Sequence, residues 1–319
     1  MSGPAQRFVG IDVGGTNLKA GLVDRSGRLL AAARRPLDFQ GPAAFAAALA
    51  ELTAEAADRG GVPLSDVDAV GIGLPGAVAG GEVLFTTNIP LEHVPLAEML
   101  RQRLHLPVLL GNDADCAAVG EYFRGAGRGL TDFAVVTLGT GVGAGVILGG
   151  RLRGGEASSE AGHMVTHAGG LPCPCGRRGC WEQYASATAL VRMTRAAMAR
   201  HPESLLCRLA EERGGVDGRT PFLAAEAGDA AALEVCRRYV EELAEGTASL
   251  INLLRPEAVA FGGGVAGAPE ALLLAPLRER VAALSYSRHG GRAARLVRAE
   301  LGNDAGIIGA ALLSRATST

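Results

Sequence analysis

A glycine turn near the start of the chain carries residue types that bind phosphate. Asp12 is followed by Gly14, Gly15 and Thr16, and apolar segments lie on both sides of the turn. Glycine allows backbone N–H groups to approach an anion closely, Thr16 adds a hydroxyl donor, and the Asp12 carboxylate can hold Mg²⁺ through water. Lys19 can neutralise phosphate or face solvent. A plain hairpin is the alternative, but it rarely needs an aspartate two residues before Gly-Gly-Thr, so phosphate binding is favoured.

Two later glycine runs fit the same chemistry. Gly139, Thr140 and Gly141 form a turn between two apolar segments, and with the first turn they predict two loops that hold one polyphosphate. Gly262–Gly264 follow a short apolar segment, which suits either contact with a nucleotide or a tight strand-to-helix turn. The chain has no G-x-x-x-x-G-K-[ST] loop and no G-x-G-x-x-G at its first strand. This argues against a P-loop enzyme and a Rossmann dehydrogenase.

A candidate catalytic base lies at Gly111-Asn112-Asp113, where an apolar strand ends and a helix begins. In phosphoryl transfer to an alcohol, one carboxylate accepts the hydroxyl proton while metal and backbone donors stabilise the phosphoryl charge. Asp113 suits this role. Capping of the helix by Asn112 or Asp113, worth about 1 kcal/mol, explains the same residues equally well.

A candidate metal site combines His163 with Cys173, Cys175 and Cys180. One imidazole and three thiolates make a closed tetrahedral set, which is typical of structural zinc because no position stays open to water. Zinc would fix a loop that has few apolar residues, and unligated thiols are the alternative. The other cysteines lie in helical patterns and are expected to be small core residues: Cys116, Cys207 and Cys236.

Two carboxylates accompany this loop. Glu160 precedes His163 by three residues, and Glu182 follows Cys180 by two. Carboxylates that line a cleft suit the recognition of sugar hydroxyls, whereas surface ion pairs are the alternative. The remaining histidines have no evident partner in the sequence and are expected at the surface: His93, His105, His167, His201 and His289.

Strands and helices alternate along the chain, which predicts an α/β fold. Phe8–Ala33 and Phe133–Arg153 share one plan of strand, glycine turn, strand, tight turn and strand. This predicts an internal duplication, with two similar halves that meet at a cleft. We expect further strands at Val67–Gly73, Val108–Leu110 and Ala258–Phe261, and helices at Ala43–Ala57, Pro95–Leu104, Asp113–Phe123, Gln183–Arg200, Leu205–Glu212, Ala230–Leu254, Pro269–Leu284 and Ala305–Arg315.

Composition excludes several classes of protein. Of the 319 residues, 48% are hydrophobic and 20% charged, enough for a large core and too apolar for a disordered chain. The net charge of −2 gives no general attraction to nucleic acid or to an anionic membrane. Residues 133–150 carry no charge, but six of them are glycine, so buried strands explain the run better than a membrane span. The start, MSGPAQRF, shows no targeting signal, and we expect a cytoplasmic protein.

Together these motifs resemble the ROK family (repressor, open reading frame, kinase) of sugar kinases and sugar-responsive repressors. The resemblance covers nearly the whole chain and rests, in the family's order, on GIDVGGTNLKAGLVD, GIGLPGAV, GNDADCAAVGE, LGTGVGAGVI, EAGHM, CPCGRRGCWEQYAS, FGGGV and NDAGIIGAA. It implies the actin-like, ribonuclease-H-like duplicated two-domain ATPase fold with an interdomain cleft. We expect a smaller domain from residues 1–117 plus 305–319 and a larger one from 118–304, with the zinc loop at 163–180.

The resemblance also implies roles for individual residues. Asp113 is the base on the sugar hydroxyl, and His163 has two roles, with one ring nitrogen on zinc and the other toward the sugar. The residues implied to contact phosphate and Mg²⁺ are Asp12, Gly14, Gly15, Thr16 and Lys19. Those implied to contact ATP are Gly139, Thr140, Gly141, Gly262, Gly263 and Gly264. Those implied to contact the sugar are Asn112, Asp113, Glu160, His163 and Glu182, with Gly76 and Asn88 on the opposite wall.

The implied activity is ATP-dependent phosphorylation of the 6-hydroxyl of a hexose, and GCWEQYAS favours glucose. Kinases for N-acetylglucosamine, N-acetylmannosamine or fructose are alternatives, because the family commonly has Gly-Trp where this chain has Leu91-Glu92. A non-catalytic sugar-binding regulator is less favoured, since Asp12 and Asp113 are both present. The implied cofactors are ATP, Mg²⁺ and structural Zn²⁺.

The resemblance bears on partners as well. The family's repressors carry an N-terminal helix-turn-helix, and only seven residues precede Phe8 here, so we expect no binding to nucleic acid. No membrane partner is expected either. Family members often dimerise through the larger domain, so a homodimer is expected, with a tetramer as the alternative.

Overall fold

The computed structural model describes residues 6–86, 88–154 and 158–317 of the chain. The chain folds into two compact units. The first consists of Met1–Val135, Gly145–Ser159 and Glu300–Thr319, and the second of Val136–Ala144 and Glu160–Ala299. The division into folding domains at 1–117 plus 305–319 and 118–304 stays a prediction.

Two five-stranded sheets have the same strand order. When the strands of each sheet are counted along the chain, both sheets run 3-2-1-4-5. The shared order confirms the internal duplication that the glycine turns predict. The first sheet contains β1 (Arg7–Val13), β2 (Asn17–Asp24), β3 (Leu29–Pro36), β4 (Ala69–Leu74) and β8 (Val108–Asn112), and the second contains β9 (Phe133–Leu138), β10 (Val142–Leu148), β11 (Arg151–Leu152), β12 (Ala258–Gly262) and β13 (Arg295–Arg298).

The carboxyl ends of three parallel strands meet at one edge of the first sheet. β1 pairs with β4 and β4 with β8, so Asp12 lies beside Gly73 and Leu74 beside Asn112. β2 runs antiparallel to β1 and places Lys19 opposite Asp12. In α/β sheets, ligands bind outside the carboxyl ends of the strands. The first glycine turn and the start of the helix after β8 share this edge.

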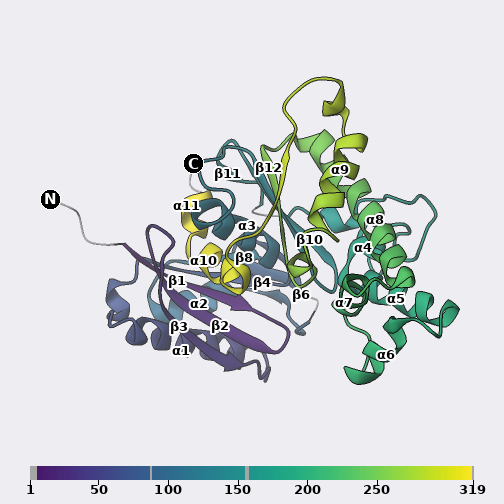
Figure 1. Ribbon diagram of the computed structural model, residues 1–319. Coiled ribbons are helices and arrows are strands. Elements are labelled where there is room, and N and C mark those ends of the chain that lie inside the picture. The colour runs from purple at the N-terminus through teal and green to yellow at the C-terminus, as the bar shows by residue number, and fades with distance from the viewer. Residues whose placement is uncertain (1–5, 87, 155–157, 318–319) are drawn as a thin grey trace. The chain divides into compact units, whose positions relative to one another are not determined.

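Helix α1 (Pro42–Arg59) packs against β2 and β3 in the first unit (Figure 1). Its buried residues Phe45, Leu49, Leu52 and Ala56 recur every three or four positions, which is the spacing of one helix face. Helix α2 (Leu96–Leu104) packs on α1. These two helices and the sheet form the hydrophobic core of the unit.

Helix α10 (Ala305–Ala311) lies in backbone contact with β1 and with α3 (Asp113–Arg124). A Cβ added at Gly10 would overlap the Ile307 carbonyl oxygen, and one at Gly309 would overlap the Cys116 carbonyl oxygen. Only glycine fits at such contacts. The expected helix 305–315 is two helices, α10 and α11 (Leu313–Thr317), and the Asp304 side chain makes no cap hydrogen bond.

A small antiparallel sheet that the sequence analysis does not predict lies between β4 and α2 in the chain. It consists of β5 (Gly76–Ala79), β6 (Glu82–Thr86) and β7 (Glu92–Val94). Its strands have three to five residues, too few to show a clear alternation of apolar and polar positions. The turn from β5 to β6 uses Gly80 and Gly81, both at positive φ.

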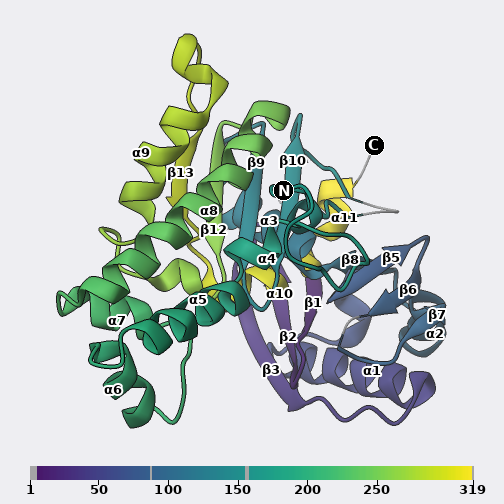
Figure 2. The same ribbon diagram turned by 90° about the vertical axis from the view of Figure 1, so that its right-hand side faces the viewer.

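The second unit is largely helical. The expected helix Gln183–Arg200 is broken at Ser186, whose hydroxyl accepts the Ala189 N–H at 3.1 Å and caps α5. Helix α9 (Leu274–Leu284) begins at Leu274 instead of Pro269, and the short elements α7 (Thr220–Glu226) and β13 are not predicted from the sequence. Helices α5, α7 and α9 pack against α8 (Figure 2). The helices are α4 (Glu182–Ala185), α5 (Ala187–Arg200), α6 (Leu205–Glu212), α7 (Thr220–Glu226), α8 (Ala230–Leu254) and α9 (Leu274–Leu284).

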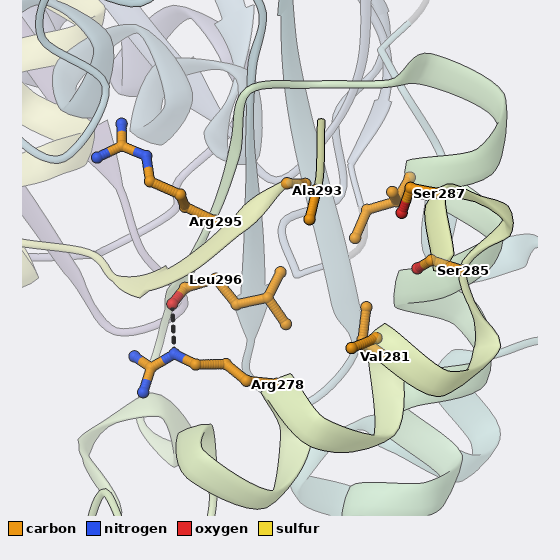
Figure 3. A pocket seen from close by; sticks show the side chains of 10 residues that line it. Arg278, Val281, Ser285, Ser287, Ala293, Arg295 and Leu296 are labelled. Carbon is orange, nitrogen blue, oxygen red and sulfur yellow. Dashed lines mark hydrogen bonds between the residues drawn. The ribbon is translucent and has the colours of Figure 1, made fainter. Parts of the chain in front are cut away.

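A cavity of about 270 Å³ lies between α9 and β13 (Figure 3). Ser285 lies on its wall, and the buried Oγ of this residue has no hydrogen-bond partner among the described residues. The Arg278 Nε donates to the Leu296 carbonyl at 2.9 Å, and the guanidinium points away from Ser285. Arg295 lines the cavity and pairs with Ala258 at the amino end of β12. The cavity therefore lies away from the glycines 262–264 at the carboxyl end of this strand.

No helix in the described part of the chain combines the length and the apolar character needed to cross a membrane. The long uncharged run 133–150 forms β9 and β10, as its glycine content predicts.

The Glu121 carboxylate is fully buried at the end of α3. It accepts backbone N–H groups from Ala126 at 2.9 Å, Glu300 at 3.1 Å and Leu301 at 2.7 Å. A buried charge is tolerated when hydrogen bonds replace its hydration. Glu121 therefore fastens the end of α3 to the segment that leads into α10.

We expect Glu121→Gln to lower the free energy of unfolding by about 2–3 kcal/mol, because the amide loses charge-assisted hydrogen bonds and buries an NH₂ donor. Urea unfolding followed by circular dichroism measures this. Glu98→Gln is the control, since Glu98 is exposed on α2 and its ion pair with Arg101 spans 3.8 Å. Equal stability of the Glu121→Gln variant and the parent protein would show that the network does not hold α3.

Candidate active site and metal centre

The first glycine turn presents its tip to solvent. Gly15 and Thr16 are exposed, and the Gly14 N–H donates to the Asn17 carbonyl at 3.0 Å, which closes the turn. Lys19 Nζ lies 3.4 Å from Asp12 Oδ2, as the register of β1 and β2 dictates. Lys19 thus pairs with Asp12 and does not simply face solvent.

Asp12 is the residue of this turn that suits a magnesium ion. Burial raises the pKa of Asp12 above its usual value, although the charge of Lys19 acts in the opposite direction. Carboxylate oxygen is the ligand type that Mg²⁺ prefers, usually with several waters retained. A Cβ at Gly306 would lie 3.0 Å from Asp12 Oδ1, so glycine there keeps the carboxylate uncrowded. The donor chemistry fits Mg²⁺.

Asn112 is the cap of helix α3. Its Oδ1 accepts the N–H groups of Ala114 at 2.8 Å and Asp115 at 3.3 Å. Asp113 is the first residue of the helix, is exposed, and shares the Ala114 N–H through its Oδ1 at 2.8 Å. From the sequence, either residue can cap the helix, and in the structure the cap is chiefly Asn112. Asp113 is therefore not needed as the cap.

The predicted sugar wall of the first unit lies beside these residues. Asn112 Nδ2 donates to the Gly76 carbonyl at 3.1 Å. Gly76 has φ +146°, and a Cβ there would overlap the Phe85 carbonyl, so the close approach requires glycine. Asn88 is exposed, and its Nδ2 would lie 3.7 Å from a Cβ at Gly15. The structure thus brings Asn88 to the first phosphate turn and Gly76 to Asn112.

In the second unit the two later glycine runs adjoin each other. Gly263 has φ +83°, and a Cβ there would lie 2.5 Å from the carbonyl oxygen of Leu138, directly before Gly139. The Gly139 carbonyl accepts the Ala187 N–H at 2.8 Å, and the Thr140 carbonyl accepts the Thr188 hydroxyl at 2.7 Å. The start of α5 therefore holds the 139–141 turn in place beside Gly262–Gly264.

The four predicted zinc ligands form one cluster. Their ligand atoms all lie within 4.8 Å of one another. His163 Nδ1 is 3.6 Å from Cys173 Sγ, and Cys175 Sγ is 3.6 Å from Cys180 Sγ. A tetrahedral zinc with bonds of about 2.3 Å places sulfur ligands ~3.8 Å apart. The chemistry and spacing of these atoms fit a structural zinc ion.

The thiols differ in acidity. The Arg177 backbone N–H lowers the pKa of Cys175, whereas burial raises the pKa of Cys173 to about 12 and also raises that of Cys180. As a thiol, Cys173 donates to Glu182 Oε1 at 3.2 Å. Zinc binding deprotonates its cysteine ligands. Metal binding would therefore replace this hydrogen bond and change the surroundings of Glu182.

His163 turns its two ring nitrogens to different neighbours. Nδ1 faces Cys173 Sγ, and Nε2 lies 4.0 Å from Glu160 Oε2. Glu182 Oε1 is 3.9 Å from Nδ1. A Cβ at Gly141 would lie 2.7 Å from Glu182 Oε2, so the second phosphate turn and this carboxylate are neighbours. The zinc-facing nitrogen is Nδ1, and the structure brings Glu160, His163 and Glu182 together.

Sequence analysis misses one contact of this loop. His167 is predicted to be a surface residue without a partner, but its Nε2 lies 3.3 Å from Glu242 Oε2 on α8. Its ring also stacks on Tyr184, with 4.0 Å between centroids. Glu242 stands 75 positions away, and no local pattern links the two residues.

Comparison with known proteins places the chain among sugar kinases. The sequence model of the ROK family matches residues 8–317. The glucokinases of Streptomyces coelicolor and Thermotoga maritima are each 38% identical to this chain. The first alignment covers 96% of this chain and the second 97%, and each covers 97% of the relative. The crystal structure of a ROK family glucokinase from Streptomyces griseus, in complex with glucose and AMPPNP, has a TM-score of 0.81 at 38% identity and covers 97% of this chain and 99% of that one. These likenesses confirm the actin-like α/β fold.

We expect protein purified without added metal to contain about one zinc per chain by elemental analysis. Cys175→Ser should lose most of this zinc, because it removes one of four ligands, and should unfold at a lower temperature. Cys207→Ser is the control, since Cys207 lies on α6 outside the cluster. A chain without zinc whose cluster thiols all react freely would contradict the site.

Proposed function

The chain belongs to the ROK family, and we propose on that basis that it is a glucokinase, which transfers the γ-phosphate of ATP to the 6-hydroxyl of glucose. The observation that carries this proposal is the likeness over nearly the whole chain to glucokinases, one of them crystallised with glucose and AMPPNP. The geometry within each unit supports it. The first unit carries the base and the first phosphate turn, and the second carries the other turns and the zinc loop.

Asp113 is the proposed catalytic base. It lies at the carboxyl edge of the first sheet, directly after β8, and Asn112 performs the capping. The carboxylate accepts the proton of the sugar 6-hydroxyl while that oxygen attacks the γ-phosphorus in line and ADP leaves. The chemistry needs one carboxylate at an exposed position, which Asp113 supplies.

The glycine turns are proposed to hold the nucleotide. Gly14, Gly15 and Thr16 offer backbone and hydroxyl donors to phosphate oxygens, and Lys19 adds a positive charge beside Asp12. Asp12 holds Mg²⁺ through water, and the ion when bound neutralises charge on the transferred phosphate. In the second unit, Gly139, Thr140 and Gly141 bind phosphate, with Gly262, Gly263 and Gly264 beside the rest of the nucleotide.

The polar side chains around the base and the zinc loop are proposed to bind the sugar. They are Gly76, Asn88, Asn112 and Asp113 in the first unit, and Glu160, His163 and Glu182 in the second. His163 would hold zinc through Nδ1, which would fix the orientation of the ring, and its Nε2 is proposed to contact the sugar hydroxyls. Leu91, which stands where the family commonly has glycine, is buried.

The assembly and setting are proposed from the resemblance alone. The protein is proposed to be a cytoplasmic homodimer, with a smaller folding domain at 1–117 plus 305–319 and a larger one at 118–304. Its partners are a sugar and ATP.

We expect Asp113→Asn to lower kcat by about 10²–10⁴-fold, because the amide cannot accept the hydroxyl proton. Glucose binding measured by calorimetry should change little, since the side chain keeps its shape. Asp66→Asn, an exposed carboxylate after α1, is the control and should retain full activity. Turnover that survives the Asp113 substitution would remove this residue from the mechanism.

A panel of sugars tests the substrate. ADP release with Mg–ATP should give the highest kcat/KM for glucose among glucose, mannose, fructose, N-acetylglucosamine and N-acetylmannosamine. A clear preference for an acetamido sugar or for fructose would assign the chain to another kinase of the family. Absence of sugar-dependent ADP release from folded, zinc-loaded protein would favour a binding protein.

A further inference from the structure

The zinc loop is joined to helix α8 by contacts that do not involve the metal ligands. His167 Nε2 lies 3.3 Å from Glu242 Oε2, and the indole Nε1 of Trp181 donates to the Glu242 carbonyl at 3.0 Å. The His167 ring stacks on Tyr184, whose hydroxyl accepts the Leu171 N–H at 2.7 Å. Glu242 on α8 thus contacts the loop at two places, through His167 near its start and through Trp181 just after its last cysteine.

The packing requires glycine at two of these contacts. A Cβ at Gly246, one turn after Glu242, would overlap the indole of Trp181. A Cβ at Gly179 would overlap the His167 carbonyl, and Gly179 has φ +83°. A larger residue at Gly246 would push Trp181 away from α8, and one at Gly179 would displace the loop backbone at His167.

The contacts flank the side chains proposed to face the sugar. His167 follows His163 by four residues, and Trp181 directly precedes Glu182. The fully buried Trp181 also follows the zinc ligand Cys180. The loop is therefore held in two ways, by zinc at its ligands and by α8 at the neighbouring residues.

The contact between His167 and Glu242 differs from the surface pairs of this protein. The Glu242 side chain is 13% exposed and the His167 side chain 38%, whereas both side chains of the Arg208–Glu212 pair are 60% exposed or more. Burial raises the pKa of Glu242, and the nearby His167 opposes this effect. Exposed pairs contribute little, but removal of one partner of a partly buried pair leaves a charge without compensation.

We propose that Glu242 and His167 are positioning residues for sugar binding: the contact between their side chains holds the zinc loop on α8 and so keeps His163 and Glu182 in register. Neither residue is assigned a contact with the substrate. The inference rests on the proposed glucose site, and it adds a support for that site which is independent of the metal ligands.

Steady-state kinetics of the full, zinc-loaded chain test the effect on the sugar. Glu242→Gln should raise KM for glucose about tenfold and leave kcat and KM for ATP within about threefold, because only the sugar-binding side chains shift. His167→Gln should have the same effect, and the double variant should be no worse than either single one, as expected for one shared interaction. Glu245→Gln is the matched control, since it is exposed on the same helix and its pair with Arg280 spans 3.8 Å.

A second readout does not depend on turnover. Transfer of zinc to a colorimetric chelator should be about tenfold faster in Glu242→Gln and His167→Gln than in the parent protein and in Glu245→Gln. The fluorescence of Trp181, the single tryptophan of the chain, should shift in the same two variants.

The outcomes separate this inference from the proposed function. Faster zinc transfer in a protein that phosphorylates no sugar would retain the loop support and overturn the kinase proposal. Unchanged zinc transfer and unchanged glucose KM would overturn the support, as would an equal rise in KM for glucose and ATP, or a double variant whose effects are additive.

Discussion

Direct backbone contact between α10 and its neighbours is the constraint on which the first unit depends. Glycines at Gly10 and Gly309 let the helix touch β1 and α3 without an intervening layer of side chains. Asp12 lies near the end of β1, and Asp113 is the first residue of α3. Protein interiors are close-packed and transmit displacements. One helix therefore fixes the residue proposed for Mg²⁺ and the residue proposed as base with respect to each other.

The second unit fixes its polar groups by other means. The segment from His163 to Glu182 carries the predicted zinc ligands, and the contact of His167 with Glu242 and the buried indole of Trp181 attach it to α8. Gly141 is part of the same arrangement, because its missing side chain leaves room for the Glu182 carboxylate. The turn proposed to bind phosphate and the carboxylate proposed to bind sugar are thus direct neighbours.

The sequence predicts those features that depend on local pattern or on a repeated plan. The internal duplication, the metal cluster and the helix at Asp113 belong to this group, since each follows from a repeated plan or from spacing within a short segment. The small sheet of residues 76–94, the break at Ser186 and the strand Arg295–Arg298 escape prediction, because these elements are short and depend on tertiary pairing. The His167–Glu242 pair joins segments 75 positions apart. Nothing in either segment identifies the other, and only folding brings them together.

The adjacent residues Asn112 and Asp113 show why a cap and a base are better placed on two residues. A carboxylate that accepts the N–H groups of a helix start is stabilised in its ionised form, which makes it a weaker base. Asn112 has no charge to titrate, takes the N–H groups of Ala114 and Asp115, and still donates to the Gly76 carbonyl with its amide nitrogen. It thereby orders the helix start and the sugar wall together. Asp113, one position later, shares only the Ala114 N–H at 2.8 Å, so the bonds of Asn112 still hold the helix start when Asp113 accepts a proton.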